Sequence, residues 1–232
     1  MTLQVRNVDT FYGTSHILHG VSLEMADREL FAVLGRNGAG KTTLLRSITG
    51  INSPALGSIL LDGTEIAHLK SHRRTWLGVS YVPQGREIIP DITVAENIYL
   101  ALIGKGRKHK KVPDFVFEYF PALKPLVGQK GGTLSGGQQQ QLAIARALVQ
   151  EPKLLLMDEP TEGLQPSVVE EIEPIIKRIP VERNCAVLLV EQNLEFVRAI
   201  MQKFAILETG RIVASGDIGE LTPDVVQRHL SV

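Results

Sequence analysis

The chain has 232 residues, of which 44% are hydrophobic and 22% charged, which is ordinary globular usage and excludes a largely disordered chain. Its 25 basic and 25 acidic residues cancel, which argues against a broad basic face for nucleic acid, so we expect no nucleic-acid partner. A single cysteine, Cys185, excludes an internal disulfide and a multi-cysteine metal site.

The sequence shows no sign of a membrane anchor. No apolar run approaches the ~18 residues that a membrane helix needs, and the N-terminus, MTLQVRNVDT, has no signal-peptide core. We therefore expect a soluble, cytoplasmic protein. If it works at a membrane, it does so by docking to another protein.

Short β-type runs separated by turn residues dominate the first third of the chain. The candidate strands are Leu3–Val8, Val21–Met25, Glu29–Leu34, Ser58–Leu61 and Val79–Pro83. Further on, Lys153–Asp158 is a continuous apolar run that ends in acid, which is typical of a strand buried on both faces. Cys185–Val190 is its expected neighbour, and the segments Phe204–Leu207 and Arg211–Ala214 predict a closing hairpin.

The middle of the chain, from about 85 to 150, carries little strand signal. The patterns predict helices at Thr93–Ile103, Phe115–Leu123 and Gly136–Gln150. Strands alternating with helices favour an α/β fold, and a helical lobe inserted into a sheet domain is the simplest account. The basic run at 107–111 is interpreted as a solvated loop or as a contact with a partner or with lipid headgroups.

The segment GRNGAGKT at 35–42 is the strongest motif, because it matches G-x-x-x-x-G-K-[ST] between an apolar strand and a helix-like stretch. Glycines let the backbone approach a phosphate and turn successive amides inward, and the following helix points its positive end at the same anion. Lys41 is expected between the β- and γ-phosphates and the Thr42 hydroxyl on Mg²⁺. The alternative is a glycine-rich turn without a ligand.

Asp158 and Glu159 follow the apolar run LLLM. Open α/β sheets place ligands at the carboxyl ends of their strands. There an Asp can hold Mg²⁺, and the adjacent Glu can polarise a water for attack on the γ-phosphate. The alternative interpretation is a helix-capping pair after a strand.

The segment Leu134-Ser135-Gly136-Gly137-Gln138 opens a predicted helix. Ser135 and Gln138 fit a capping box, but two glycines cost about 1 kcal/mol each in a helix relative to Ala, and capping alone gives no reason for them. Glycines at a helix start suit close approach to an anion. Because the chain already has one phosphate cradle, we expect this second one to contact a phosphate held by another protomer.

These motifs, with Gln84 after a strand, stand in the order found in ATP-binding-cassette (ABC) transporter ATPases, and the resemblance runs from about Leu3 to Val232. The resemblance implies a P-loop NTPase (RecA-like) core with an N-terminal antiparallel β subdomain and an inserted α-helical subdomain. The implied catalytic core is 1–84 and 151–232, and the implied helical subdomain, with the signature motif, is 85–150.

The resemblance also implies ATP hydrolysis with ATP and Mg²⁺ as cofactors. The implied catalytic residues are Glu159, Gln192 and Lys41. Adenine would stack on Tyr12, whose alternative is an ordinary strand-end tyrosine, and Mg²⁺ would be held by Thr42, Gln84 and Asp158. The implied ATP-binding loop comprises Gly35, Arg36, Asn37, Gly38, Ala39, Gly40, Lys41, Thr42 and Thr43.

Cassettes of this family pair head to tail, which implies that Ser135, Gly136, Gly137 and Gln138 contact the ATP bound by a second ABC ATPase subunit. Two transmembrane permease subunits, and indirectly an external substrate-binding protein, are the other implied partners. The implied location is peripheral, on the cytoplasmic face of the membrane. Ile88, Ile89 and Ile92 are candidate apolar contacts for a permease helix, or else local core packing.

Several stretches resemble importers of the branched-chain amino acid and urea type, namely the segments at 82–97, 134–148, 158–167 and 188–193. The four successive glutamines and EGLQPS are most similar to the urea transporter's ATP-binding subunit. Import of urea or short-chain amides is the leading prediction, and branched-chain amino acid import is the alternative. An exporter motor and a soluble ABC ATPase unconnected with transport are the competing classes.

The sequence departs from the family at two positions. Gln192 stands where most relatives have a histidine that contacts the γ-phosphate, and glutamine cannot carry the charge of an imidazolium. The aspartate usual in the following inter-subunit loop is also missing, since Glu162-Gly163-Leu164-Gln165 stands there. We hypothesise a heterodimer in which this chain's own site turns over more slowly, although a homodimer is possible for the isolated chain.

Overall fold

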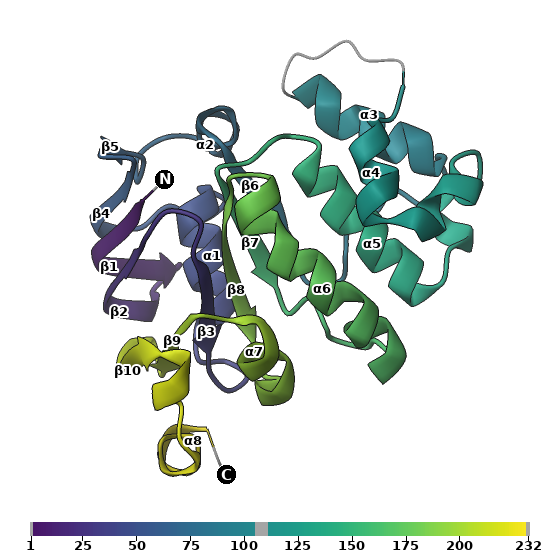
Figure 1. Ribbon diagram of the computed structural model, residues 1–232. Helices are drawn as coiled ribbons and strands as arrows, with labels where there is room; N and C mark the ends of the chain where they lie inside the picture. The colour runs from purple at the N-terminus through teal and green to yellow at the C-terminus, as the bar shows by residue number, and fades with distance from the viewer. Residues whose placement is uncertain (1, 105–110, 231–232) are drawn as a thin grey trace.

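Two β-sheets lie on either side of helix α1 (Lys41–Thr49) in the computed structural model, which describes residues 2–104 and 111–230 (Figure 1). The smaller sheet is antiparallel, with strand order β2-β1-β4-β5. Its strands are β1 (Leu3–Tyr12), β2 (Ser15–Met25), β4 (Leu56–Leu61) and β5 (Thr64–Glu65). Leucine and isoleucine side chains of α1 pack between the two sheets, so these layers share one core.

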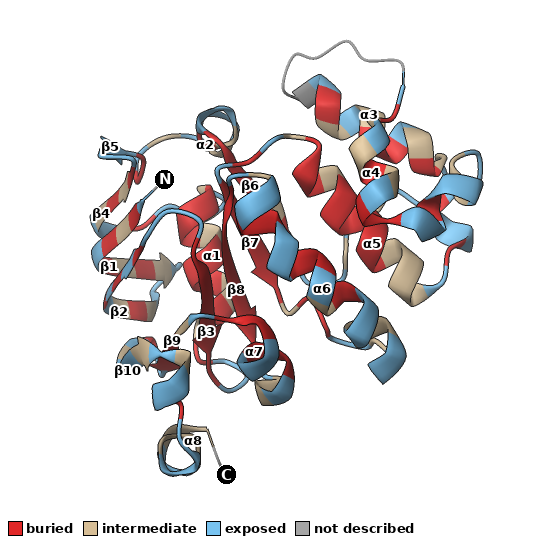
Figure 2. Cartoon of the chain, viewed as in Figure 1, coloured by how far each residue is buried: buried red, intermediate tan, exposed pale blue. Residues whose placement is uncertain are grey.

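The larger sheet has the order β10-β9-β3-β8-β7-β6. Its strands are β3 (Leu30–Leu34), β6 (Val79–Val82), β7 (Leu154–Asp158), β8 (Ala186–Glu191), β9 (Lys203–Glu208) and β10 (Arg211–Asp217). They are parallel except for β10, which pairs with β9 as the predicted hairpin. Every residue of β3, β7 and β8 is buried (Figure 2), which is why these strands are continuous apolar runs.

Helix α2 (Ser71–Leu77) packs against the end of α1. The remaining helices cover the other face of the larger sheet or form the region beside it. They are α3 (Val94–Gly104), α4 (Asp114–Tyr119), α5 (Gly136–Leu148), α6 (Pro166–Glu182), α7 (Leu194–Ile200) and α8 (Pro223–His229). Between β6 and β7 the described residues form helices and one isolated bridge but no named strand, as the sequence predicts for this region. Of the basic run, 107–110 lie outside the described residues, and Lys111 is exposed and pairs with Asp114.

Proline explains two differences from the predicted elements. The helix predicted at Phe115–Leu123 divides, because α4 ends at Tyr119 and Pro121 opens a 3-10 helix, η1 (Pro121–Leu126). Helix α6 was not predicted because Pro174 and Pro180 lie within it, and proline removes a helical hydrogen bond. Its buried isoleucine stripe against the sheet maintains the helix despite both prolines.

Arg74 fastens α2 to the end of α1. Its side chain is fully buried and donates to the carbonyl groups of Ser47, Ile48, Leu69 and Ala67. Two of those carbonyls belong to the last turn of α1, which has no further helical donor. Burial lowers the pKa of Arg74 to about 10. The guanidinium therefore acts as a buried cap for α1.

The chain leaves β6 through three consecutive residues in the left-handed region. Gly85, Arg86 and Glu87 have φ values of 77°, 70° and 44°. Arg146 of α5 holds this bend, since its Nη1 donates to the Glu87 carbonyl at 2.7 Å. Left-handed backbone is unfavourable for residues with a Cβ atom, so this bend is strained.

The carboxyl ends of β3, β7 and β8 meet at one edge of the larger sheet. Leu34 of β3 lies opposite Glu191 of β8, and Asp158 of β7 lies opposite Val190. The phosphate loop follows the first of these strands and Glu159 follows the second. This edge is where an open α/β sheet places its ligands.

Candidate active site

The loop at 35–42 joins β3 to α1 and ends in an uncapped helix start. Gly38 and Gly40 have φ values of 79° and 105°, which only glycine adopts readily. Helix α1 has no side-chain cap at its N-terminus and no acidic residue in its first turn. Its first backbone N–H groups therefore lack the usual internal partners, and this arrangement suits a phosphate.

Lys41 is buried beneath this loop. Its Nζ donates to the carbonyl of Gly35 at 2.8 Å and to that of Arg36 at 3.2 Å. The same atom lies 3.0 Å from Glu159 Oε1. An ammonium that donates to its own loop and to a carboxylate is placed to donate to a phosphate oxygen instead.

Asp158 is buried, and its carboxylate accepts hydrogen bonds from two hydroxyl groups. Thr42 Oγ1 donates to its Oδ1 at 3.1 Å, and the Tyr81 hydroxyl donates to its Oδ2 at 2.8 Å. Burial raises the pKa of Asp158, and the hydrogen bonds from Tyr81 and Thr42 oppose that shift. A carboxylate beside a threonine hydroxyl is the oxygen-ligand chemistry that Mg²⁺ prefers.

Glu159 and Gln192 meet across the sheet edge. Gln192 Nε2 donates to Glu159 Oε1 at 2.9 Å and to Asn37 Oδ1 at 2.8 Å. Glu159 has a φ of 46°, and its backbone N–H bonds to the Val190 carbonyl at 3.0 Å. The two side chains form one hydrogen-bonded group with the phosphate loop.

Gln84 and Tyr12 line the cavity that the phosphate loop also lines. Gln84 Nε2 donates to Glu162 Oε2 at 2.9 Å, so the glutamine is tied to the loop that follows Glu159. Tyr12 is 43% exposed, which leaves its ring surface available for stacking. Arg46 lies beside the Tyr12 hydroxyl, and this interaction raises the pKa of Arg46.

A cavity of about 320 Å³ gathers most of the residues expected to bind nucleotide. Its lining comprises Tyr12, Ile17, Arg36, Asn37, Gly38, Gly40, Lys41, Thr42, Thr43, Gln84 and Glu159. Of the other expected loop residues, Gly35 and Ala39 line adjoining hollows. Asp158 and Gln192 do not line this cavity, but each is hydrogen-bonded to a residue that does, Asp158 to Thr42 and Gln192 to Glu159.

The signature residues Ser135 to Gln138 lie elsewhere, since none of them lines that cavity. Ser135 and Gln138 form a complete capping box at the start of α5. A methyl group added at Gly137 would lie 2.7 Å from Val168 Cγ1, and one at Gly136 would lie 3.3 Å from Arg86 Nη1. The packing of α6 therefore supplies one reason for Gly137, which the sequence alone did not reveal.

The sequence did not single out three residues that hold the site together. Tyr81 donates to Asp158, Arg46 lies beside Tyr12, and Glu191 accepts hydrogen bonds from the loops that follow β7 and β8. Glu191 had a signal, because it is the charged end of an apolar strand. Tyr81 and Arg46 had none, since their partners are distant in sequence.

A phosphate loop feeding a helix, with a carboxylate pair at the end of another parallel strand of the same sheet, defines a P-loop nucleotide hydrolase. The chain belongs to the ABC transporter family, whose model matches residues 18–162. Cassettes of this family are ATPases that drive transport, so ATP hydrolysis is the activity of this chain, as the sequence predicts.

Two similar proteins are named for the transport of branched-chain amino acids. The chain is 41% identical to the high-affinity branched-chain amino acid transport ATP-binding protein BraG of Pseudomonas aeruginosa, over 91% of each chain. It is 36% identical to the probable branched-chain amino acid transport ATP-binding protein LivF of Archaeoglobus fulgidus, over 94% of this chain and 93% of that one.

Solved structures share the fold. A nucleotide-free ATP-binding cassette from an ABC transporter superposes with a TM-score of 0.86 at 25% identity, covering 98% of both chains. A dimeric cassette in a post-hydrolysis state with ADP and Pi gives 0.83 at 26% identity, covering 93% of this chain and 98% of that one. The predicted fold class, a P-loop NTPase core with an antiparallel β subdomain and a helical insertion, is confirmed.

Among residues 2–104 and 111–230, no helix has the length and apolar composition needed to cross a lipid bilayer.

Proposed function

We propose that the cavity beside α1 binds ATP with its phosphates on the 35–43 loop and its adenine on Tyr12. The uncapped start of α1 and the buried Lys41 ammonium support the phosphate position. The exposed Tyr12 ring at the cavity edge supports the adenine position. Binding requires Lys41 to exchange Glu159 for a phosphate oxygen.

Thr42 and Asp158 would hold Mg²⁺, with Gln84 completing the set. Their hydroxyl and carboxylate oxygens are already 3.1 Å apart, and both are the hard ligands that this cation takes. The bound cation would neutralise charge on the β- and γ-phosphates. Gln84 lines the same cavity but is bonded to Glu162, so it must exchange that partner to join.

Hydrolysis is assigned to Glu159, assisted by Gln192 and Lys41. Glu159 carries the carboxylate that accepts the proton of the attacking water. Gln192 orients that carboxylate through its 2.9 Å hydrogen bond, and Lys41 stabilises charge on the γ-phosphate. Only glutamine stands at the position of the usual histidine, so this site lacks one cationic donor.

We infer a head-to-tail dimer in which Ser135, Gly136, Gly137 and Gln138 contact ATP held by the partner subunit. None of them lines this chain's own cavity, which supports that role, and a similar cassette has been captured as a dimer. The missing histidine and aspartate favour a heterodimer with a better-equipped sister subunit.

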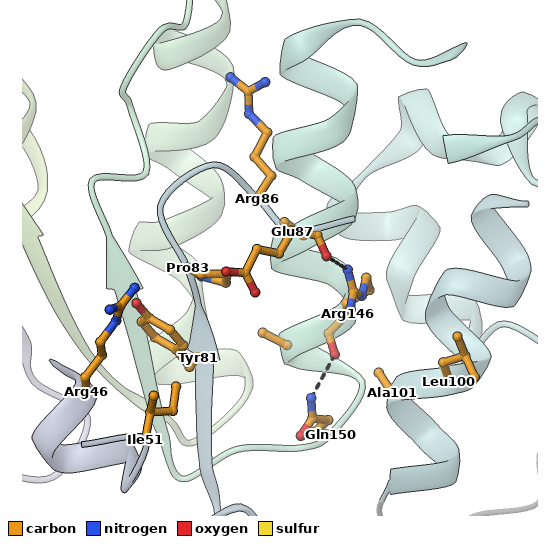
Figure 3. A pocket seen from close by; sticks show the side chains of 12 residues that line it. Arg46, Ile51, Tyr81, Pro83, Arg86, Glu87, Leu100, Ala101, Arg146 and Gln150 are labelled. Atoms are coloured by element: carbon orange, nitrogen blue, oxygen red, sulfur yellow. Dashed lines mark hydrogen bonds between the residues drawn. The ribbon is translucent and has the colours of Figure 1, made fainter. Parts of the chain in front are cut away.

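A second cavity, of about 570 Å³, is the proposed docking groove for a transmembrane permease subunit (Figure 3). Arg46, Arg86 and Arg146 line it against a single acidic residue, Glu87. Arg146 Nε is buried there without a hydrogen-bond partner among the described residues. Ile89 lies exposed nearby in sequence, whereas Ile88 packs on the helical core. An apolar helix carrying acid fits this lining.

In this proposal the chain sits on the cytoplasmic face of the membrane, paired with two permease subunits that receive substrate from an external binding protein. Urea or a short-chain amide is the first candidate substrate. The run Gln138–Gln141 and the segment at 162–167 support it, because both resemble the urea transporter's subunit. Branched-chain amino acids are the second candidate, favoured by the relatives BraG and LivF.

Uptake measurements in the native host test this assignment. Cells carrying Lys41→Ala in place of the native chain are compared for uptake of labelled urea and labelled leucine. Loss of urea uptake alone supports the first candidate, and loss of leucine uptake alone supports the second. Normal uptake of both would reject both substrates.

A further inference from the structure

Glu191 is a buried acid that none of the proposed roles uses. It is the last residue of β8 and is 3% exposed. Its Oε1 accepts the backbone N–H and the hydroxyl of Thr161, at 2.9 and 2.6 Å. Its Oε2 accepts the backbone N–H groups of Gln192 and Asn193, at 2.8 and 3.1 Å. One carboxylate therefore joins two loops.

The two loops are those that carry the proposed hydrolytic groups. Thr161 comes two residues after Glu159, and Gln192 directly follows Glu191. Both loops leave neighbouring parallel strands, β7 and β8. The distance between the Glu159 and Gln192 side chains consequently depends on the clamp that Glu191 forms between their backbones.

The contact between Glu159 and Gln192 matters more once nucleotide is bound. Glu159 Oε1 has Lys41 and Gln192 as its side-chain partners. A γ-phosphate that takes over Lys41 leaves Gln192 as the group that orients the carboxylate. The orientation of Glu159 in the nucleotide-bound site therefore depends on where the Gln192 backbone is held.

The four donors also explain why an acid occupies this position. They comprise three backbone amides and one hydroxyl, all neutral, and each points at a carboxylate oxygen. An ionised carboxylate only accepts, so it satisfies both loops at once. A carboxamide has one accepting oxygen, and its NH₂ group would face the N–H donors of the other loop.

We propose that Glu191 is a positioning residue for ATP hydrolysis, which holds the Gln192 carboxamide on the Glu159 carboxylate. The inference rests on the roles proposed above for Glu159 and Gln192. It adds a buried clamp, outside the nucleotide cavity, that controls the hydrolytic step but not binding.

The main test is Glu191→Gln in the full chain, measured alone and assembled with its partner subunits. We expect kcat for ATP hydrolysis to fall about 10-fold or more, as for the loss of other buried groups that orient a reacting residue. KM and the Kd for ATP stay near the wild-type values, because the phosphate loop is built on β3 and α1.

Two further variants separate positioning from stability. Thr161→Val keeps the side-chain volume but loses the hydroxyl bond to Glu191, so it lowers kcat. Thr161→Ser keeps that bond, so its kcat stays near the wild-type value. The matched control is Glu29→Gln. Glu29 is also a buried acid, but it binds Ala26 and Lys203 at the opposite end of β3, so its variant lowers Tm without changing kcat.

The outcomes are distinguishable. If Glu191→Gln lowers only Tm, as Glu29→Gln does, the positioning role is rejected, and if it fails to fold, a normal kcat for Thr161→Val rejects it equally. Full hydrolysis by Glu159→Gln would instead show that the proposed site is wrong. Loss of hydrolysis in Glu159→Gln together with normal kcat in Glu191→Gln rejects the role of Glu191 alone.

Discussion

Lys41 and Glu159 form a buried ion pair, with Nζ 3.0 Å from Oε1 and side-chain exposures of 4% and 9%. In the proposed site the same ammonium binds the γ-phosphate and stabilises its charge. A carboxylate and a phosphate thus compete for one cation, and the ion pair weakens ATP binding by the free energy needed to separate it.

Glu159→Gln is expected to bind ATP about 10-fold more tightly, because a neutral amide gives up Lys41 more readily than a carboxylate does. Hydrolysis falls about 100-fold or more, since the amide cannot accept a proton. Calorimetric titration with ATP and a turnover assay measure both effects. Glu162→Gln is the control, because it removes a nearby charge that does not contact Lys41, and equal Kd values for the two variants would contradict the competition.

Gln192→His is expected to raise hydrolysis by the isolated chain about 10-fold, because it restores a donor that can carry charge beside the γ-phosphate. The gain is present while the imidazole is protonated and declines as pH rises through the histidine pKa, ordinarily near 6.5. A pH–rate profile of both proteins measures it. If the isolated native chain already matches the complex and the variant changes nothing, the two sites are equivalent and the asymmetry hypothesis fails.

Asp158→Asn is expected to stabilise the fold while destroying the Mg²⁺ site. Burial raises the pKa of Asp158, so the ionised group is less favourable in the folded chain than in the unfolded one. That penalty is absent below the unfolded pKa of about 3.9 and complete above the raised folded pKa. The variant therefore has a higher Tm at pH 7 and loses the advantage near pH 3.

The cation side of this prediction is measured by titrating ATP in the presence and absence of Mg²⁺. The native chain gains affinity from Mg²⁺, and Asp158→Asn gains about 10-fold less. Native Mg²⁺ dependence in the variant would show that Asp158 is not a ligand.

Arg74→Met is expected to destabilise the chain by about 2–3 kcal/mol, because it leaves buried carbonyls at the end of α1 without a donor. In a chain of this size the corresponding decrease in Tm is about 5–10 °C. Thermal unfolding followed by circular dichroism measures it. Arg73→Met is the matched control, since Arg73 is exposed over the Trp76 ring, and a similar loss in both variants would rule out a specific cap.

Ile89→Asp is expected to uncouple transport from hydrolysis, because Ile89 is 38% exposed and lies two residues after Glu87, which lines the proposed groove. Tm and basal ATPase activity remain normal. Ile88→Asp gives a different result, since Ile88 packs on the helical core and its variant lowers Tm. Normal transport by Ile89→Asp would place the permease contact elsewhere.

Local motifs account for what the sequence predicted well. The loop at 35–42 and the pair Asp158-Glu159 were found because each lies in one short segment next to a strand, and the parallel sheet brings their ends together. The buried strands β7 and β8 were equally readable from their apolar runs.

What the sequence missed depends on partners far along the chain. The hydrogen bond between Gln84 and Glu162, the cap formed by Arg74, and the Glu191 clamp each join residues that no spacing rule connects. Helix α6 was missed for the opposite reason, because the local signal of Pro174 and Pro180 is overridden by burial of its isoleucine face.

The left-handed bend at Gly85–Glu87 separates the nucleotide cavity from the groove lined by arginines. Each non-glycine residue in that conformation raises the energy by about 1–2 kcal/mol, and Arg86 and Glu87 both adopt it. Because Arg146 Nη1 donates to the Glu87 carbonyl, a movement of Gln84 toward a bound cation would pull on helix α5 through this bend. The backbone at 85–87 would then link the occupancy of the nucleotide cavity to the position of the helix that lines the proposed docking groove.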